Sequence, residues 1–219
     1  MSSLLPSCLR DVWSPLESAA ADLSSSANVI DGDTIEIGDA VVRLADIDAP
    51  ELGQRCEGPK PIRPCGRLAA EILAGRIEGA TVVCKSAETD TYGRHIASCE
   101  HNGEDLSTWL VREGYALAFR KYSSRLVGLE EEARSEARGL WQGTVEPPWE
   151  FRARRWVGAA QGAPDGCPIK GTISRSGERI YHAPWSQYYA RTRIDEAGGK
   201  RWFCDEGEAP AAGWRLPQR

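Results

Sequence analysis

Residues 29–51 read VIDGDTIEIGDAVVRLADIDAPE, and the fold of the chain follows from this pattern. Ile35 and Ile37 alternate with polar neighbours, and a second apolar alternation follows the Gly38-Asp39 turn and stops before Pro50. A period of two between short glycine-containing turns is typical of antiparallel strands. The stretch therefore predicts three successive strands, one from Asn28, one over 34–37 and one over Val41–Ile47.

The same stretch is unusually acidic for a structural hairpin. It holds one arginine and seven carboxylates, namely Asp31, Asp33, Glu36, Asp39, Asp46, Asp48 and Glu51. Asp33, Asp48 and Glu51, with Arg43 among them, are of the types that hold a hard cation and a phosphate together. This combination indicates phosphodiester chemistry. The alternative for the aspartates is turn formation, because Asp favours Asp-Gly turns through bonds from its side chain to the backbone.

The sequence beyond residue 51 extends the same architecture. The run GRLAAEILAGRI (residues 66–77) predicts a helix, and further helices are expected at about 105–113 and 124–138. Strands are expected over 81–86 and 94–100, separated by turn signals at 89–93. Five strands with inserted and trailing helices, and no alternation of parallel strands with helices, predict a small α+β barrel with three helices.

Composition changes divide the chain into four parts. Residues 1–27 are rich in Ser and Ala and are expected to be a disordered or leader-like segment, although no apolar run precedes the small residues at 19–21. The barrel domain is expected over 28–150, followed by a basic Gly/Ala linker over 151–165. Residues 166–219 have their own aromatic set and predict a small C-terminal domain, which needs a covalent staple at this size.

The charge is unevenly distributed. The net charge is −5, and because residues 163–219 carry nine Lys and Arg against seven Asp and Glu, residues 1–162 carry a net charge of −7. An acidic domain does not attract nucleic acid over long range. Binding of a polyanion must therefore be local, through a metal ion and a few arginines. No apolar run approaches the roughly 18 residues of a membrane span, so none is predicted.

The seven cysteines predict disulfides. They include no CxxC pair, which disfavours a zinc ribbon. With Cys8 set aside, Cys84 and Cys99 flank an expected hairpin, Cys56 and Cys65 bracket a proline-rich loop, and Cys167 and Cys204 bracket the C-terminal domain. Three local disulfides imply an oxidising compartment, periplasmic or extracellular. The alternatives are buried free thiols, or a zinc site of Cys167, Cys204 and His182 that lacks a fourth ligand.

Five separated motifs carry a family resemblance. DGDT (31–34), RLADIDAPE (43–51), DTYGR (90–94), LVREGYA (110–116) and ARGLW (137–141) resemble, in this order and spacing, the staphylococcal nuclease (thermonuclease) family. The resemblance covers about residues 28–142 and implies an OB-fold barrel with three helices. It also implies calcium-dependent hydrolysis of DNA and RNA at the bond between phosphorus and the 5′ oxygen, which leaves 3′-phosphate ends.

The resemblance implies a ligand set for Ca²⁺. Asp33 and Asp48 match the calcium carboxylates, and Ala49 stands where the family commonly has threonine and contributes its backbone carbonyl. Asp31 resembles an acid that orders metal-bound water. Because Ca²⁺ takes six to eight oxygen ligands, this set leaves room for water and a phosphate oxygen.

The resemblance also implies the reacting residues. Glu51 matches the carboxylate that orients or deprotonates the attacking water, and its alternative is a solvated loop glutamate. Arg43 and Arg94 match the pair that grips the scissile phosphate, a role suited to the planar guanidinium. Arg43 has the alternative of neutralising its acidic neighbours.

Three aromatic residues complete the expected site. Tyr92 matches a nucleotide-contacting tyrosine, with Thr91 where the family has a basic residue, and Phe119 and Tyr122 fall near its base-stacking tyrosines. The alternative for Phe119 and Tyr122 is packing.

The set of reacting residues is complete, which favours an active nuclease, and we expect the protein to be a monomer. The other readings are an OB-fold module that binds nucleic acid or another anion without turnover, and an interaction protein. The pattern CPIKGTIS…YH…RWFCDE…AAGWR resembles an extension behind some bacterial nuclease domains; it implies no function and leaves open a stapled cap or a module that binds polyanion or cell wall.

Overall fold

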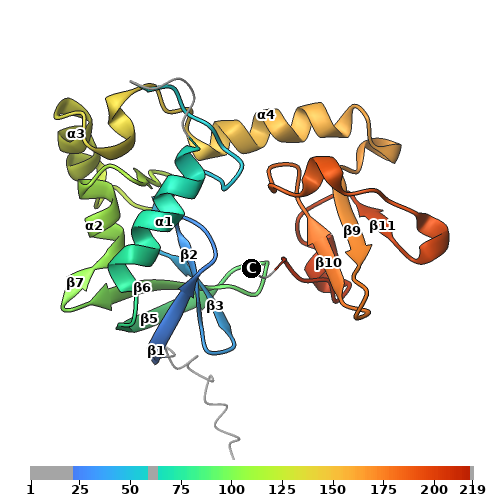
Figure 1. Cartoon of the computed structure of the whole chain (residues 1–219), viewed down its shortest axis with the longest axis horizontal. Coiled ribbons are helices and arrows are strands. Elements are labelled where there is room, and N and C mark those ends of the chain that lie inside the picture. The colour runs from blue at the N-terminus through green and yellow to red at the C-terminus, as the bar shows by residue number, and fades with distance from the viewer. Residues whose placement is uncertain (1–21, 59–63, 218–219) are drawn as a thin grey trace, which may run out of the picture.

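The computed structural model describes residues 22–58 and 64–217, which form two lobes joined by a helix (Figure 1). The larger lobe is a barrel. Its sheet has the order β3-β2-β1-β5-β6, and a parallel pairing of β3 with β6 closes it into five strands. The strands are β1 (Asp22–Val29), β2 (Thr34–Ile37), β3 (Ala40–Leu44), β5 (Thr81–Thr89) and β6 (His95–His101). The predicted α+β OB-fold barrel is confirmed.

Three helices pack around the barrel as predicted. They are α1 (Cys65–Ile77), α2 (Leu106–Arg112) and α3 (Val127–Ser135). The side chains of Leu73 on α1 and Leu110 on α2 are fully buried against Ile35, Val42 and Leu44 of the strands. The short strand β7 (Glu104–Asp105) extends the sheet beyond β6, and a 3₁₀ turn, η1 (Gly139–Gln142), follows α3.

The strand expected over Val41–Ile47 is interrupted. β3 ends at Leu44, Asp46 adopts a left-handed conformation with φ of 66°, and the chain resumes as β4 (Ile47–Asp48), which pairs with β8 (Leu117–Ala118). A non-glycine residue at positive φ breaks the alternation of faces. As a result Ile47 and Asp48 are both buried, instead of alternating between the two faces.

The prediction of disorder up to residue 27 was wrong for residues 22–27. Asp22–Val29 forms β1, which pairs antiparallel with β5 from Asp22 opposite Lys85 to Ser26 opposite Thr81. Strand pairing is made by backbone hydrogen bonds, so a serine-rich segment with little β propensity still adds to a sheet when a partner strand is present. The remaining part of that prediction, residues 1–21, lies outside the described residues.

The basic linker expected over 151–165 is mostly helical. The helix α4 (Pro148–Ala160) has proline in its first turn, where the missing N–H costs nothing, and it runs from the barrel to the second lobe (Figure 1). Phe151 is buried, and Trp156 packs against the core of the second lobe.

The second lobe, residues 164–217, is a small unit with its own core. A three-stranded sheet of order β10-β9-β11 is formed by β9 (Ile169–Ile173), β10 (Arg179–His182) and β11 (Arg201–Phe203). A short helix, α5 (Glu208–Ala211), and three 3₁₀ turns, η2 (Pro164–Gly166), η3 (Tyr189–Arg191) and η4 (Glu196–Gly198), complete it. Phe203 and Trp214 meet edge to face at 5.4 Å in the centre. We call this lobe the C-terminal unit.

All three predicted disulfides are present. They join Cys56 to Cys65, Cys84 to Cys99, and Cys167 to Cys204. The last pairing rules out the alternative of a zinc site with His182, because a disulfide sulfur is not a thiolate ligand. Cys8 lies outside the described residues. Within residues 22–58 and 64–217, no helix combines the length and the apolar character needed to cross a bilayer.

Candidate active site

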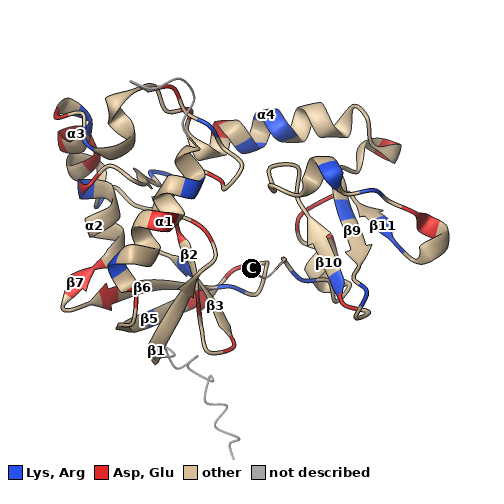
Figure 2. Ribbon diagram, in the orientation of Figure 1, with Lys and Arg blue, Asp and Glu red and all other residues tan. Residues whose placement is uncertain are grey.

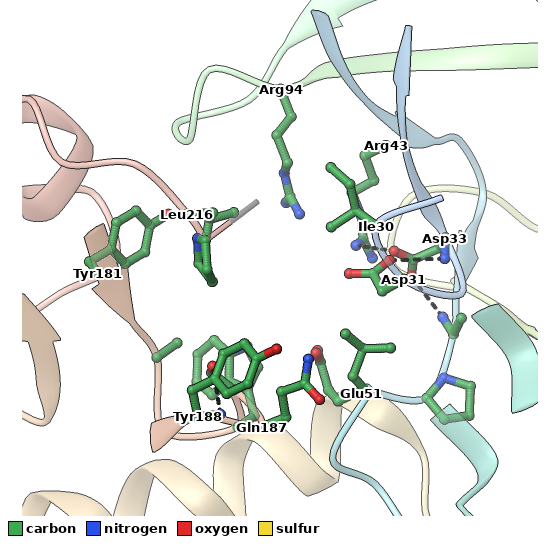
Figure 3. Close-up of a pocket in the computed structure, with 17 residues that line it drawn as sticks. Ile30, Asp31, Asp33, Arg43, Glu51, Arg94, Tyr181, Gln187, Tyr188 and Leu216 are labelled. Atoms are coloured by element: carbon green, nitrogen blue, oxygen red, sulfur yellow. Dashed lines mark hydrogen bonds and ion pairs between the residues drawn. The ribbon is translucent and has the colours of Figure 1, made fainter. Parts of the chain in front are cut away.

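Three neighbouring backbone segments bring Asp33, Arg43 and Asp48 together. Asp33 precedes β2, Arg43 lies on β3 opposite Thr34, and Asp48 ends β4. The Arg43 guanidinium bridges the two acids, with Nη1 2.9 Å from Asp33 Oδ1 (Figure 3) and Nη2 3.0 Å from Asp48 Oδ1. Both carboxylates are buried and have little access to water. Their negative charges are therefore compensated by Arg43 and not by solvent.

Two glycines allow the loops of the site to approach closely. A Cβ atom at Gly32 would lie 2.7 Å from the Ala49 Cβ and 2.9 Å from the Ala69 Cβ, and one at Gly66 would lie 1.7 Å from the Glu51 carbonyl oxygen. Real Cβ atoms do not come this close to other heavy atoms, so only glycine fits. The turn at 31–33, the segment at 49–51 and the start of α1 are therefore pressed against one another.

Hydrogen bonds fix the two aspartates of the DGDT motif. Asp33 Oδ2 accepts a hydrogen bond from the Ala49 N–H at 2.7 Å, and Asp31 Oδ1 accepts one from the Asp33 N–H at 3.1 Å. Burial would raise the pKa of Asp33, but the charge of Arg43 and the Ala49 N–H outweigh it and hold the pKa below its usual value. Burial, together with the charge of Asp33, raises the pKa of Asp31 to about 7. The two neighbouring acids thus differ in proton affinity.

Glu51 is held by its backbone and by an ion pair. The fully buried side chain of Gln54 accepts a hydrogen bond from the Glu51 N–H at 3.2 Å and donates one to the Glu146 carbonyl at 2.6 Å. The Glu51 Oε1 atom lies 2.9 Å from Arg152 Nη1. Burial raises the pKa of Glu51 to about 8 even though Arg152 opposes the shift. A carboxylate with a raised pKa is suited to accept a proton near neutral pH.

Arg152 of α4 reaches into this cluster from 104 residues along the chain. Its Nη2 lies 2.6 Å from Asp48 Oδ2 and its Nη1 lies 3.0 Å from Asp48 Oδ1. Sequence reasoning assigned Arg152 to a linker and missed this role. The only local signal was its place among three arginines at 152, 154 and 155, and the other two behave differently: Arg154 pairs with Glu146, and Arg155 donates to the Pro184 carbonyl.

Arg94 approaches from the turn between β5 and β6. Its Nε donates to Asp90 Oδ2 at 2.8 Å, while Asp90 Oδ1 accepts from the backbone N–H groups of Tyr92 and Arg94. The guanidinium also lies 4.8 Å from the centre of the Tyr92 ring. Asp90 therefore orients Arg94, a role that the DTYGR motif contains but that its sequence did not reveal.

A cavity of about 140 Å³ collects these side chains. From the barrel it is lined by Asp31, Asp33, Arg43, Ala49, Glu51 and Arg94. Figure 3 shows Arg94 and Arg43 pointing into it from one side and Glu51 from the other, with Tyr188 and Leu216 of the C-terminal unit facing them. Arg43, on β3, and Arg94, in the turn between β5 and β6, thus line one cavity together with Glu51.

Of the three aromatic residues expected to bind the nucleotide, one lines a cavity near the acidic cluster and two do not. Tyr92 lines an adjoining cavity of about 630 Å³. Phe119 and Tyr122 are not among the residues that line either cavity; Phe119 stacks on Trp149 at 5.9 Å, and Tyr122 is 73% exposed. The structure therefore does not bring the expected pair of stacking side chains to the acidic cluster.

The oxygen atoms of the acidic cluster are of the type that binds a hard cation. No group of three or more His, Cys, Asp and Glu side chains in the described residues is arranged around a metal position. Asp33 and Asp48 supply buried carboxylate oxygens, the ligand type that Ca²⁺ prefers, and the Arg152 guanidinium stands as a cation against Asp48. A metal ion bound to Asp48 would have to share or replace the contact with Arg152.

Charge on the surface does not offer a broad alternative site. Figure 2 shows basic and acidic residues interspersed over the barrel lobe, with basic residues also along α4. Many surface arginines have a carboxylate partner, for example Arg125 with Asp46 and Arg138 with Glu132. Arg43 and Arg94 are paired with carboxylates as well, but these two arginines line one cavity, which gives an anion two guanidinium groups in the same place.

The sequence is similar to those of several known proteins. The model of the family "Staphylococcal nuclease homologue" matches residues 41–143, a range that contains Arg43, Asp48, Glu51 and Arg94. The chain is 34% identical over 142 residues to the succinoglycan biosynthesis protein ExoI of Rhizobium meliloti, a match that covers 63% of this chain and 74% of that protein. It is 32% identical over 142 residues to the micrococcal nuclease of Shigella flexneri, covering 57% and 76% respectively. A probable staphylococcal-like nuclease, CAN1 of Oryza sativa, is 29% identical over 122 residues, which cover 54% of this chain and 34% of that protein.

Proposed function

Because this chain belongs to the staphylococcal nuclease family, we propose that it is a calcium-dependent nuclease that hydrolyses DNA and RNA with little sequence preference. The observation that carries the proposal is the shared cavity of Asp33, Arg43, Glu51 and Arg94, in which a carboxylate with a raised pKa lies across from two guanidinium groups. The reaction adds water to phosphorus and breaks the bond to the 5′ oxygen, which leaves with a proton. The products are a 3′-phosphate and a 5′-hydroxyl.

Arg43 and Arg94 would hold the scissile phosphate. A guanidinium donates parallel hydrogen bonds to phosphate oxygens and remains charged at every accessible pH. Both side chains are prepared for this role, because Arg43 is fixed by Asp33 and Asp48 while Arg94 is fixed by Asp90. Positioned positive charges stabilise the negative charge that builds on the phosphoryl oxygens in the transition state.

Glu51 would receive the proton of the attacking water. It lines the cavity and its raised pKa matches a base that works near neutral pH. Gln54 holds its backbone, and Arg152 holds its carboxylate at 2.9 Å. Because Arg152 also contacts Asp48, it would keep the base at a fixed place relative to the buried acids.

Asp33 and Asp48, with the carbonyl of Ala49, would hold Ca²⁺, and Asp31 would order water beside it. The bound ion would supply positive charge that polarises a phosphate oxygen. Two carboxylates and a carbonyl leave several of the six to eight calcium positions for water and substrate. Tyr92 would contact the nucleotide chain in the adjoining cavity.

The three disulfides support an extracytoplasmic place of action, periplasmic or secreted. We propose that the protein acts there as a monomer, with residues 28–150 as the catalytic domain and the C-terminal unit as a second domain.

Cleavage of a single-stranded DNA oligonucleotide tests the proposal. With Ca²⁺ we expect products ending in 3′-phosphate, and with a chelator we expect no cleavage. Glu51→Gln is expected to lower kcat by about 10²–10⁴ and Arg94→Ala by about 10²–10³. Matched controls are Glu131→Gln and Arg120→Ala, whose side chains are 67% and 53% exposed away from the cavity.

Two results would count against a nuclease. Cleavage that persists in chelator and in both variants would show that another protein or another site is responsible. Binding of the oligonucleotide without any cleavage would favour the alternative, a non-catalytic OB-fold module.

A further inference from the structure

The cavity of the active site has a second wall that the barrel does not supply. Its C-terminal side includes Tyr181, Trp185, Gln187, Tyr188 and Leu216. We call the loop 183–188, between β10 and η3, the facing loop. Figure 3 shows Gln187 and Tyr188 pointing into the cavity from below, opposite Arg94. The facing loop lies outside residues 41–143, so the family match assigns it nothing.

Three contacts fix the facing loop relative to the catalytic residues. Arg155 Nε donates to the Pro184 carbonyl at 3.1 Å, and the rings of Trp156 and Trp185 lie 6.2 Å apart. Arg155 and Trp156 belong to α4, the helix whose Arg152 binds Asp48. On the barrel side, a Cβ atom at Gly53 would lie 3.4 Å from the Trp185 carbonyl oxygen, so the two loops are in contact. These contacts hold the second wall in a fixed position relative to the catalytic residues.

The chemistry of this wall differs from that of the barrel side. None of the residues that the C-terminal unit contributes to the cavity is Lys, Arg, Asp or Glu, whereas the barrel side holds two arginines and three acids. A phosphate group would be bound by the arginines. An uncharged aromatic and amide surface suits a planar heterocycle, because every nucleobase has a face that stacks and an edge that forms hydrogen bonds.

Two side chains of the wall have unused binding capacity. Among residues 22–58 and 64–217, neither the Gln187 amide nor the Tyr188 hydroxyl has a hydrogen-bond partner. One face of the Tyr188 ring is covered by Arg191, whose guanidinium carbon lies 4.2 Å from the ring centre. Such a contact holds the ring in place and adds positive charge behind it, which favours stacking on its other face.

Resting on the proposed nuclease function, we propose that the facing loop binds the nucleobase next to the scissile phosphate, with Tyr188 stacking on the base and Gln187 bonding its edge. The phosphate lies at Arg43 and Arg94, and the base lies across the cavity against the loop. A base that stacks on Tyr188 has given up its stacking neighbour on that face, which a base inside a continuous duplex does not do. The substrate at this position is therefore a single-stranded or locally unpaired nucleotide.

The neighbouring cavity gives the strand a continuation. It shares Ile30, Asp31, Arg94, Tyr181 and Leu216 with the first cavity, and Tyr92, Trp214 and Arg215 line its far part. An arginine and two aromatic rings are the groups that track a single strand. The two cavities adjoin each other between the barrel and the C-terminal unit.

The test is binding by the full-length chain carrying Glu51→Gln, which prevents cleavage, in the presence of Ca²⁺. The probes are fluorescein-labelled oligothymidine and a strand of equal length in which every base is replaced by an abasic spacer, followed by fluorescence anisotropy. Tyr188→Leu and Gln187→Ala are added singly. Tyr188→Phe keeps the ring, and Gln161→Ala, at the exposed end of α4, is the matched amide control.

We expect Tyr188→Leu to raise the Kd for oligothymidine about tenfold, as loss of one base stack predicts, and Gln187→Ala to raise it several-fold. Tyr188→Phe and Gln161→Ala leave it within twofold. None of the four changes the Kd for the abasic strand. An unchanged Kd for oligothymidine in Tyr188→Leu overturns the inference, and so does an equal loss for the abasic strand, which would assign the loop to the sugar-phosphate chain or to stability. Cleavage by the unsubstituted chain is measured separately, so a failure of the nuclease proposal remains distinguishable.

Discussion

Arg152 and Asp48 form a two-point ion pair across 104 residues of sequence, with nitrogen–oxygen distances of 2.6 Å and 3.0 Å. Asp48 is fully buried and belongs to the barrel, whereas Arg152 belongs to the helix that leads to the C-terminal unit. The pair therefore connects the acidic cluster to the element that positions the facing loop.

Arg152→Gln is expected to destabilise the calcium-free protein by about 2–3 kcal/mol. Removing one partner leaves a buried charge short of compensation, and the loss stays at the low end because Arg43 still contacts Asp48. Ca²⁺ bound at Asp48 would replace the lost charge, so we expect saturating Ca²⁺ to stabilise the variant more than the unsubstituted protein. Urea unfolding with Ca²⁺ and with chelator measures both effects. Arg154→Gln, which loses only an exposed pair with Glu146, is the control; an equal loss in that variant would contradict the assigned role.

Asp90→Ala is expected to lower kcat/KM by about tenfold to a hundredfold. Asp90 orients the Arg94 guanidinium and accepts two backbone N–H groups of the same turn, and loss of orientation is costly in phosphoryl chemistry. Steady-state kinetics of oligonucleotide cleavage checks this, with Glu88→Ala on the adjoining strand as control. If Asp90→Ala cleaves like the control, Arg94 does not depend on Asp90 for its position.

Glu206 gives a pH dependence of stability. Burial raises its folded pKa to about 7, above the ordinary value near 4.3 in an unfolded chain. The folded state therefore favours the protonated form, and the destabilisation from ionising Glu206 grows as the pH rises from about 4 to about 7. Relative to the unsubstituted chain, Glu206→Gln should gain about 1–2 kcal/mol in unfolding free energy between pH 4 and pH 8, after allowance for solvent screening. Unfolding curves at the two pH values, with exposed Glu196→Gln as control, decide this; a constant difference would place the titration elsewhere.

Loss of the Cys167–Cys204 disulfide is expected to act on the C-terminal unit first. The bond closes a loop of 37 residues, for which chain entropy predicts about 4 kcal/mol, against about 3 kcal/mol for Cys56–Cys65 with its separation of nine. The double variant Cys167→Ala/Cys204→Ala should lose hydrogen-exchange protection over β9–β11 while the barrel strands keep theirs. Equal loss of protection in both lobes would mean that they unfold as one unit.

Much of the barrel was predictable because its signals are local. The alternation at Ile35 and Ile37 and the glycine turn at 38 fix two strands within a few residues, and the stripe of Leu73 and Ile77 fixes α1. The cysteine pairs were also predictable, because each brackets one local element. The strand at residues 22–27 and the helix α4 were not predictable. The serine-rich β1 forms because it pairs with β5, and α4 is stabilised by contacts at both of its ends.

The amino-acid sequence alone determined the kind of barrel, the three disulfides, and the acids and arginines available for the candidate site. These follow from periodicity, turn residues and motif spacing, which act over short distances along the chain. The tertiary structure added which groups meet: Arg152 with Asp48, and Tyr188 across the cavity from Arg43. Such contacts leave no periodic trace in sequence, because they depend on how whole elements pack after the chain has closed loops of a hundred residues.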